Sequence, residues 1–183
     1  MPLIVSLGDA LTCGKYRQMY DLDAGVGMDL NNEALENRPT DILLLQFMFQ
    51  QVFAGLGISP PGSALATDGK FGPLTHYWIL YFQMCKRHSA TPTDDDGFVA
   101  PFHEHASERG WIAAPDRSTM FALNYQLQKR LPNFDKLPEH PALPAMLRGK
   151  FKPYDTRYGR GAAEAEDPRF LAVSAVHLTT AAG

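Results

Sequence analysis

Residues 67–83 read TDGKFGPLTHYWILYFQ, and this stretch predicts a tight turn that leads directly into a helix. Asp68 and Gly69 favour the turn, because glycine readily adopts the positive φ that other residues avoid. Gly72 and Pro73 predict the helix start, since proline is tolerated at the first helical position. After them, small and apolar residues recur every three or four positions and therefore share one helix face: Thr75, Trp78, Ile79, Phe82 and Cys85. We expect this face to be part of the core.

The same stretch resembles the DG-x-FG-x-x-T...FQ signature of peptidoglycan-binding-like domains, small three-helix modules usually appended to cell-wall hydrolases. The matching positions are Asp68, Gly69, Phe71, Gly72, Pro73, Thr75, Phe82 and Gln83. A second match, to the D-V-x-x-L-Q opening of the family's first helix, consists of Asp41, Ile42, Leu45 and Gln46. Residues 96–101 resemble the D-G-x-V-G-x turn before the third helix, with Ala100 in place of the usual glycine. The resemblance implies a mainly α fold with a three-helix core.

The first helix is expected over residues 41–54, with Thr40 as its cap, and the run Gly55-Leu56-Gly57 that ends it is suited to a left-handed cap. Its core stripe is predicted to be Ile42, Leu45, Met48, Phe49 and Val52. The third helix is expected from residue 116 or 118 to about residue 130, with Asp116 as its cap. Phe71 is expected to be buried between the first two helices.

A chain of 183 residues favours a single domain with an elaborated periphery. We expect a peptidoglycan-binding-like core at 39–131, an extended amino-terminal arm at 1–38 with one short strand at 3–7, and an irregular extension at 132–183 packed on the core. Four prolines between positions 132 and 144 prevent a long helix there. Two later segments are interpreted as a mobile surface loop at 149–166, and as a strand or an ordered tail at 170–178.

The first two predicted helices also carry large apolar side chains opposite their core stripes. These are Leu43, Leu44 and Phe47 on the first helix, and Tyr77, Leu80, Tyr81 and Met84 on the second. A helix that is apolar on nearly all sides is normally buried on nearly all sides. We therefore expect the two extensions to cover these faces. The alternative is an interface with another chain, where aromatic residues and methionine are also enriched.

Composition excludes several classes of function. With 17 Lys and Arg against 20 Asp and Glu, the formal charge of -3 offers no basic surface for nucleic acid. Cys13 and Cys85 do not make a disulfide framework. The sequence predicts neither a membrane span nor a signal peptide, so we expect a soluble chain that is cytoplasmic as synthesised and reaches a cell wall only by another route.

The sequence predicts no enzyme, no cofactor and no metal site. His103, Glu104 and His105 place two imidazoles at alternate positions, but no third zinc ligand follows at a recognisable spacing, so we interpret them as part of a surface loop. The acidic run at 94–96 fails the register of a calcium-binding loop and is interpreted as a solvated turn before Gly97. No serine or cysteine lies in a recognised nucleophile motif.

The residues with side chains suited to a sugar ligand are Trp111, Tyr77 and Tyr81, because aromatic faces stack on sugar rings. Gln83 is a further candidate, although Gln46 and Gln83 could instead hydrogen-bond each other or the loop backbone. The resemblance implies a non-catalytic protein that binds peptidoglycan, either its glycan or its peptide stems. The alternative is a structural or assembly protein that uses the same bundle for protein contacts, for example in a phage-like or secretion particle. The sequence leaves the oligomeric state open.

Overall fold

The computed structural model describes residues 1–6, 18–28, 36–58, 60, 62–89, 93–103, 117–155 and 160–161. Within them the elements are β1 (Leu3–Ser6), β2 (Gln18–Asp21), β3 (Val26–Gly27), α1 (Pro39–Leu56), α2 (Pro73–Lys86), β4 (Phe98–Val99), α4 (Thr119–Gln128), the 3-10 helices η3 (Phe134–Glu139) and η4 (Ala145–Leu147), β5 (Lys152–Asp155) and β6 (Arg160–Gly161). Trp111 and the segment 170–178 lie outside the described residues. No helix in the described ranges is both long and apolar enough to cross a membrane.

The fold is mixed α/β, so the expectation of a mainly α protein with irregular extensions is wrong. Strand β1 pairs antiparallel with β2 and parallel with β5, and β5 pairs antiparallel with β6, which gives the sheet order β2-β1-β5-β6. Strands β3 and β4 form a second, two-stranded sheet. The strand predicted at 3–7 is confirmed as β1, whereas the predicted mobile loop at 149–166 contains β5 and β6.

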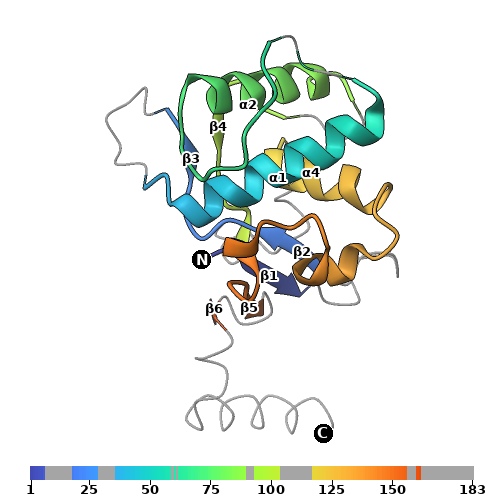
Figure 1. The fold of residues 1–183 in the computed structure, drawn as a ribbon. Coiled ribbons are helices and arrows are strands. Elements are labelled where there is room, and N and C mark those ends of the chain that lie inside the picture. Colours follow the sequence, from blue (N-terminus) through green and yellow to red (C-terminus); the bar gives the residue numbers. More distant parts are fainter. Residues whose placement is uncertain are drawn as a thin grey trace, which may run out of the picture.

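Helix α1 is the centre of the molecule. Figure 1 shows it between α2 on one side and the four-stranded sheet on the other, and its contacts include α4 and η4. Every residue from 41 to 49 is buried, including the predicted stripe and the residues opposite it. Complete burial accounts for the absence of a polar face on this helix.

Both ends of α1 extend two residues beyond the predicted helix at 41–54. The helix begins at Pro39 with Arg38 in the cap position, so Thr40 lies inside the first turn and is not the cap. Proline suits this position because the first helical N–H has no partner within the helix. The helix ends at Leu56, and Gly57, which belongs to the predicted capping run 55–57, has the left-handed conformation with a φ of 64°.

Helix α2 begins as predicted, with Gly72 in the cap position and Pro73 as its first residue. Gly69 has a φ of 69°, and a Cβ atom there would lie 2.9 Å from the carbonyl oxygen of Pro39, so only glycine fits this turn. Phe71 is only half-buried, and Cys85 in the last turn of α2 is exposed, which corrects both core assignments.

Each of the two Asp-Gly turns is held by a glutamine side chain from the preceding helix. In the first turn, Gln46 of α1 accepts hydrogen bonds from the backbone N–H groups of Asp68 (3.0 Å) and Gly69 (2.9 Å). Its amide nitrogen donates to the Asp68 carboxylate at 3.0 Å, to the Lys70 carbonyl at 3.2 Å and to the Thr75 hydroxyl at 3.3 Å. One buried side chain thus joins α1, the turn and the first turn of α2.

The second turn repeats this arrangement. Gln83 of α2 accepts from the Gly97 N–H at 2.8 Å, and it donates to the Asp96 carboxylate at 3.0 Å, to the Phe98 carbonyl at 2.9 Å and to the Thr119 hydroxyl at 3.1 Å. Thr119 is the first residue of α4, whose cap is Ser118 and not Asp116. The turn at 96–97 is therefore a structural repeat of the first one, as its sequence predicts.

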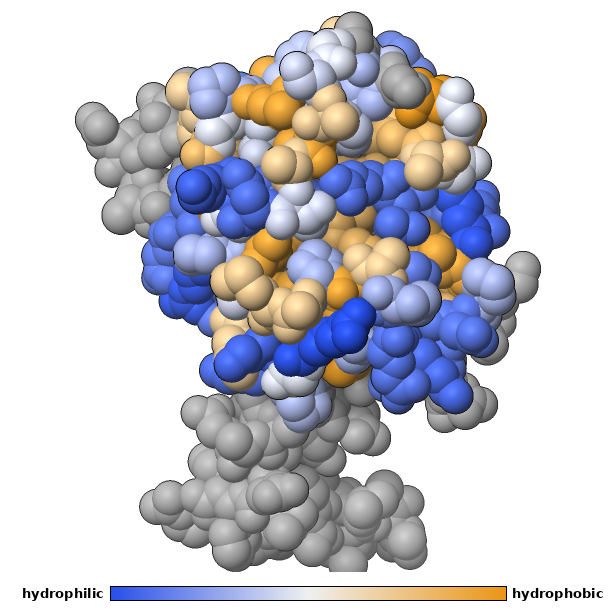
Figure 2. Space-filling model, viewed as in Figure 1, coloured by the Kyte–Doolittle hydropathy of each residue, from blue (hydrophilic) through white to orange (hydrophobic). Residues whose placement is uncertain are grey.

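Within the described ranges, the segment after residue 132 packs on α1, whereas part of α2 stays exposed. Phe47 is buried with its ring 5.7 Å from that of His140, and η4 also contacts α1. On α2, the exposed fraction is 37 % for Tyr77 and 65 % for Met84. Figure 2 shows apolar residues at the surface in the upper part of the molecule, where α2 lies. For the part of the extensions that the structure describes, the expected cover is present over α1 and is missing over Tyr77 and Met84 of α2.

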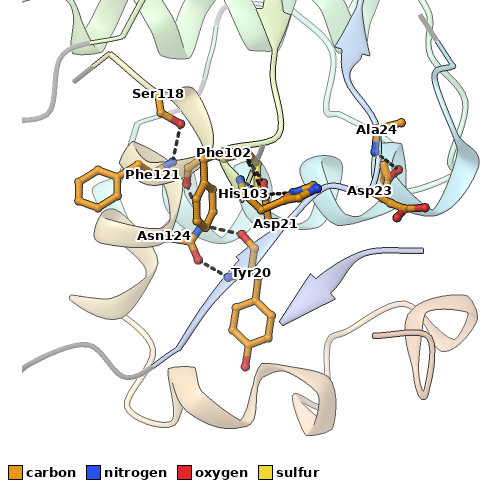
Figure 3. A network of polar contacts seen from close by, with 11 residues as sticks. Tyr20, Asp21, Asp23, Ala24, Phe102, His103, Ser118, Phe121 and Asn124 are labelled. Atoms are coloured by element: carbon orange, nitrogen blue, oxygen red, sulfur yellow. Dashed lines mark hydrogen bonds and ion pairs between the residues drawn. The ribbon is translucent and has the colours of Figure 1, made fainter. Parts of the chain in front are cut away.

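Strand β2 is tied to α4 and to the segment after it. The Asn124 side chain donates to the Tyr20 carbonyl and accepts from the Tyr20 N–H, both at 2.8 Å, in the manner of a neighbouring strand (Figure 3). The Tyr20 hydroxyl donates to the Phe134 carbonyl at 2.9 Å and accepts from the Leu137 N–H at 3.1 Å. These bonds make the amino-terminal strands part of the core.

The buried carboxyl group of Asp41, near the start of α1, is expected to make the stability of the fold depend on pH. Its buried carboxylate accepts N–H bonds from Asp23 (3.3 Å) and Ala24 (3.2 Å), and burial raises the pKa of its carboxyl to about 6. A raised pKa means that the folded state binds the proton more tightly, so this group's contribution to stability falls as the pH rises from about 4 to about 6. We expect Asp41→Asn to gain about 2 to 3 kcal/mol in unfolding free energy relative to the unsubstituted protein between pH 4 and pH 7. Denaturant titrations of both proteins across this range check it, and a difference that does not change with pH would contradict it.

Candidate ligand-binding site

A pocket of about 660 Å³ lies between the end of α1, the loop that follows it, and α2. It is lined by uncharged residues, namely Gln50, Phe53, Ala54, Gly57, Ile58, Pro60, Gly62, Ser63, Ala64, Leu65 and Trp78. We call it the Trp78 pocket. Its volume is within the usual range for small-molecule sites.

Trp78 supplies a hydrogen-bond donor without a partner. The side chain is 6 % exposed, and its Nε1 atom is buried with no hydrogen-bond partner among the described residues. The indole packs edge-on against Phe53, with ring centroids 5.3 Å apart. A buried donor without a partner lowers the stability of the fold by about 1 to 3 kcal/mol. A ligand atom that accepts a hydrogen bond from this N–H would remove that penalty, which favours binding.

The loop that forms one wall of the pocket is fastened to α1. The Gln50 amide donates to the carbonyl of Leu65 at 2.5 Å, and Leu65 itself is buried. Ser63 and Ala64, which also line the pocket, lie on the exposed side of the loop. The loop is therefore anchored at Leu65, and the two residues before it are exposed to solvent beside the pocket.

The predicted ligand-binding residues Tyr77 and Tyr81 lie next to this pocket. Their rings stack with centroids 6.2 Å apart and an interplanar angle of 25°, and the Tyr81 ring is 5.7 Å from that of Phe53. Because Phe53 also contacts Trp78, the four rings form a continuous aromatic row from the pocket to the exposed face of α2. This row offers apolar faces of the kind that sugar rings bind.

The other sequence-predicted candidates are placed differently. Gln83 has no exposed surface, and its amide is engaged by the second Asp-Gly turn, which is the loop-backbone role considered for it. Trp111 lies outside the described residues.

Sequence reasoning missed Phe53 and Trp78 as site residues because their spacing also fits a core stripe. One local signal could have indicated the pocket: the loop after Gly57 is rich in glycine and proline, and these small side chains leave space beside α1.

His103 is buried, so its assignment to a surface loop is wrong. Its Nδ1 lies 2.6 Å from the Asp21 carboxylate, which also accepts the backbone N–H groups of Phe102 at 3.0 Å and His103 at 2.8 Å (Figure 3). The His103 ring packs 4.8 Å from that of Tyr154. These contacts join the segment at 101–103 to β2 and β5, which indicates a structural role. The described residues contain no group of three or more metal-ligating side chains, and His105 lies outside them.

Comparisons with protein-family models, with curated proteins and with solved structures gave no match for this chain. The likeness to peptidoglycan-binding-like domains therefore rests on the quoted motifs. The part of it that concerns a ligand belongs to the proposal below.

Proposed function

We propose that this chain is a non-catalytic protein of the peptidoglycan-binding-like kind, which binds peptidoglycan through the Trp78 pocket and so acts at the cell envelope. The observation that carries the proposal is the pocket itself, an uncharged, aromatic-lined cavity with an unpaired donor on Trp78. The matching motifs of the first two helices add support. Binding, without bond cleavage, is the activity that this set of side chains favours.

A variant that fills the pocket tests the proposal. Ala64 lines the pocket and is exposed, so Ala64→Trp is expected to block the pocket without disturbing the core. We expect the unsubstituted protein to sediment with purified insoluble peptidoglycan and Ala64→Trp to lose at least tenfold in affinity. Ala66→Trp is the matched control, because Ala66 is exposed on the same loop but does not line the pocket.

Sedimentation that is equal for both variants would contradict the assigned pocket. Absence of sedimentation for the unsubstituted protein would contradict wall binding altogether. Release of reducing ends or free amines during incubation would contradict the non-catalytic assignment.

A structural or assembly role is the second candidate, and it is favoured by one observation. The face of α2 that carries Tyr77 and Met84 stays exposed, although strands β1 and β2 and the 3-10 helices η3 and η4 pack on the core. Exposed aromatic residues and methionine are typical of protein interfaces. A stable oligomer by light scattering that Met84→Glu dissociates would favour this role over wall binding.

A further inference from the structure

We infer that the Trp78 pocket takes an uncharged acetamido sugar of a glycan strand, and not a charged peptide stem. The inference rests on the proposed function, because it chooses between the two chemical parts of peptidoglycan. It follows from the charge of the pocket, from its unpaired donor and from its aromatic row.

Charge distinguishes the two classes of ligand. None of the residues lining the pocket is ionisable, and the whole loop sequence from 57 to 66, GISPPGSALA, contains no charged residue. A carboxylate that enters such a site loses part of its hydration and finds no cation to pair with, which is unfavourable. Peptide stems carry carboxylates, whereas an N-acetylated hexose is neutral. The pocket therefore disfavours the stem.

The donor and the rings fit the acetamido group and the sugar. An amide carbonyl is a strong acceptor, and the indole N–H of Trp78 is a donor only. Trp78 lines the pocket, and its buried Nε1 has no hydrogen-bond partner among the described residues, so this N–H is available to the acetamido carbonyl. Ser63 and Ala64, in the wall of the pocket, are exposed to solvent. The apolar face of the sugar then lies against Phe53 and its neighbouring rings.

Three soluble probes test this inference on the full chain by calorimetry: the tetramer of N-acetylglucosamine, cellotetraose, which lacks the acetamido groups, and a free stem tetrapeptide. We expect the acetylated tetramer to bind at least tenfold more tightly than cellotetraose and the peptide not to bind. Trp78→Phe keeps a ring but removes the donor, and we expect it to weaken binding of the acetylated tetramer by about 3- to 10-fold. The indole N–H resonance of Trp78, assigned by its absence from the Trp78→Phe spectrum, should shift on addition of this tetramer.

Two results would overturn the inference: binding of the tetrapeptide with a shift of the Trp78 indole resonance, or equal affinity for the acetylated tetramer and cellotetraose. If Trp78→Phe does not fold, Ala64→Trp replaces it, and undiminished binding of the acetylated tetramer to that variant would also overturn it. Wall binding that is blocked by Ala64→Trp but accompanied by no sugar binding refutes this inference and leaves the proposed function standing. Failure of the unsubstituted protein to sediment with peptidoglycan refutes the proposed function itself.

Discussion

Replacing Gln83 by alanine is expected to lower the free energy of unfolding by about 3 to 5 kcal/mol, because several buried groups would lose their partner together. The substitution leaves the Gly97 N–H, the Phe98 carbonyl and the Thr119 hydroxyl without the amide that joins them. An unsatisfied buried group costs about 1 to 3 kcal/mol, so even partial relaxation leaves a large loss. The total stability of a domain of this size is commonly only about 5 to 15 kcal/mol.

The equivalent substitution in α1, Gln46→Ala, is expected to have an effect of similar size, since Gln46 makes the same kinds of bonds to the first Asp-Gly turn. Gln51→Ala is the matched control, because Gln51 lies on the same helix and is only half-buried. Urea denaturation of the three variants measures the differences. If Gln46→Ala and Gln83→Ala unfold within about 1 kcal/mol of the control, the side chains do not hold the turns as described.

The second large effect is expected from Asn124→Ala, at about 3 kcal/mol. Asn124 is fully buried and satisfies both the N–H and the carbonyl of Tyr20. Its removal leaves two backbone groups of β2 unpaired in the interior, where water cannot replace the lost bonds. Gln128→Ala, one turn further along α4, is the control, because Gln128 makes a single long bond of 3.4 Å to the Gln18 carbonyl.

The Asn124 variant also tests whether the chain unfolds as one unit. We expect a single denaturation transition at lower urea for Asn124→Ala, seen equally by circular dichroism and by fluorescence, since β2, α4 and the segment around Phe134 share one core. Two separated transitions, or stability equal to that of Gln128→Ala, would show that the amino-terminal strands are only loosely attached.

Local signals in the sequence predict the helices and turns well. The start of α2 at Pro73, a left-handed cap within residues 55–57 and the repeated Asp-Gly turn depend on residues that are close together in the chain, and all three are confirmed. The four-stranded sheet was not predictable in this way. Leu3 pairs with Lys152, and β5 reads KPYD, which has neither alternation nor a run of β-branched residues. Its position depends on a distant partner.

The candidate site shows the same limit. Tyr77 and Tyr81 are found by their residue type and Gln83 by its match to a motif. In the structure Gln83 is buried, and the two tyrosines reach the pocket only through the contact of Tyr81 with Phe53. Trp78 and Phe53 have a spacing that also fits the core. Their proximity to an open space depends on the path of the loop after α1, which no periodic pattern encodes.

Mapping of amide chemical shifts tests most directly whether the Trp78 pocket binds peptidoglycan. The full chain, labelled with nitrogen-15, is titrated with soluble peptidoglycan fragments that contain both glycan and stem. We predict that the perturbed signals cluster at Phe53, at residues 62–65 and at Trp78. Perturbations that cluster around Met84 on the exposed face of α2, or the absence of any perturbation at saturating fragment, would contradict it.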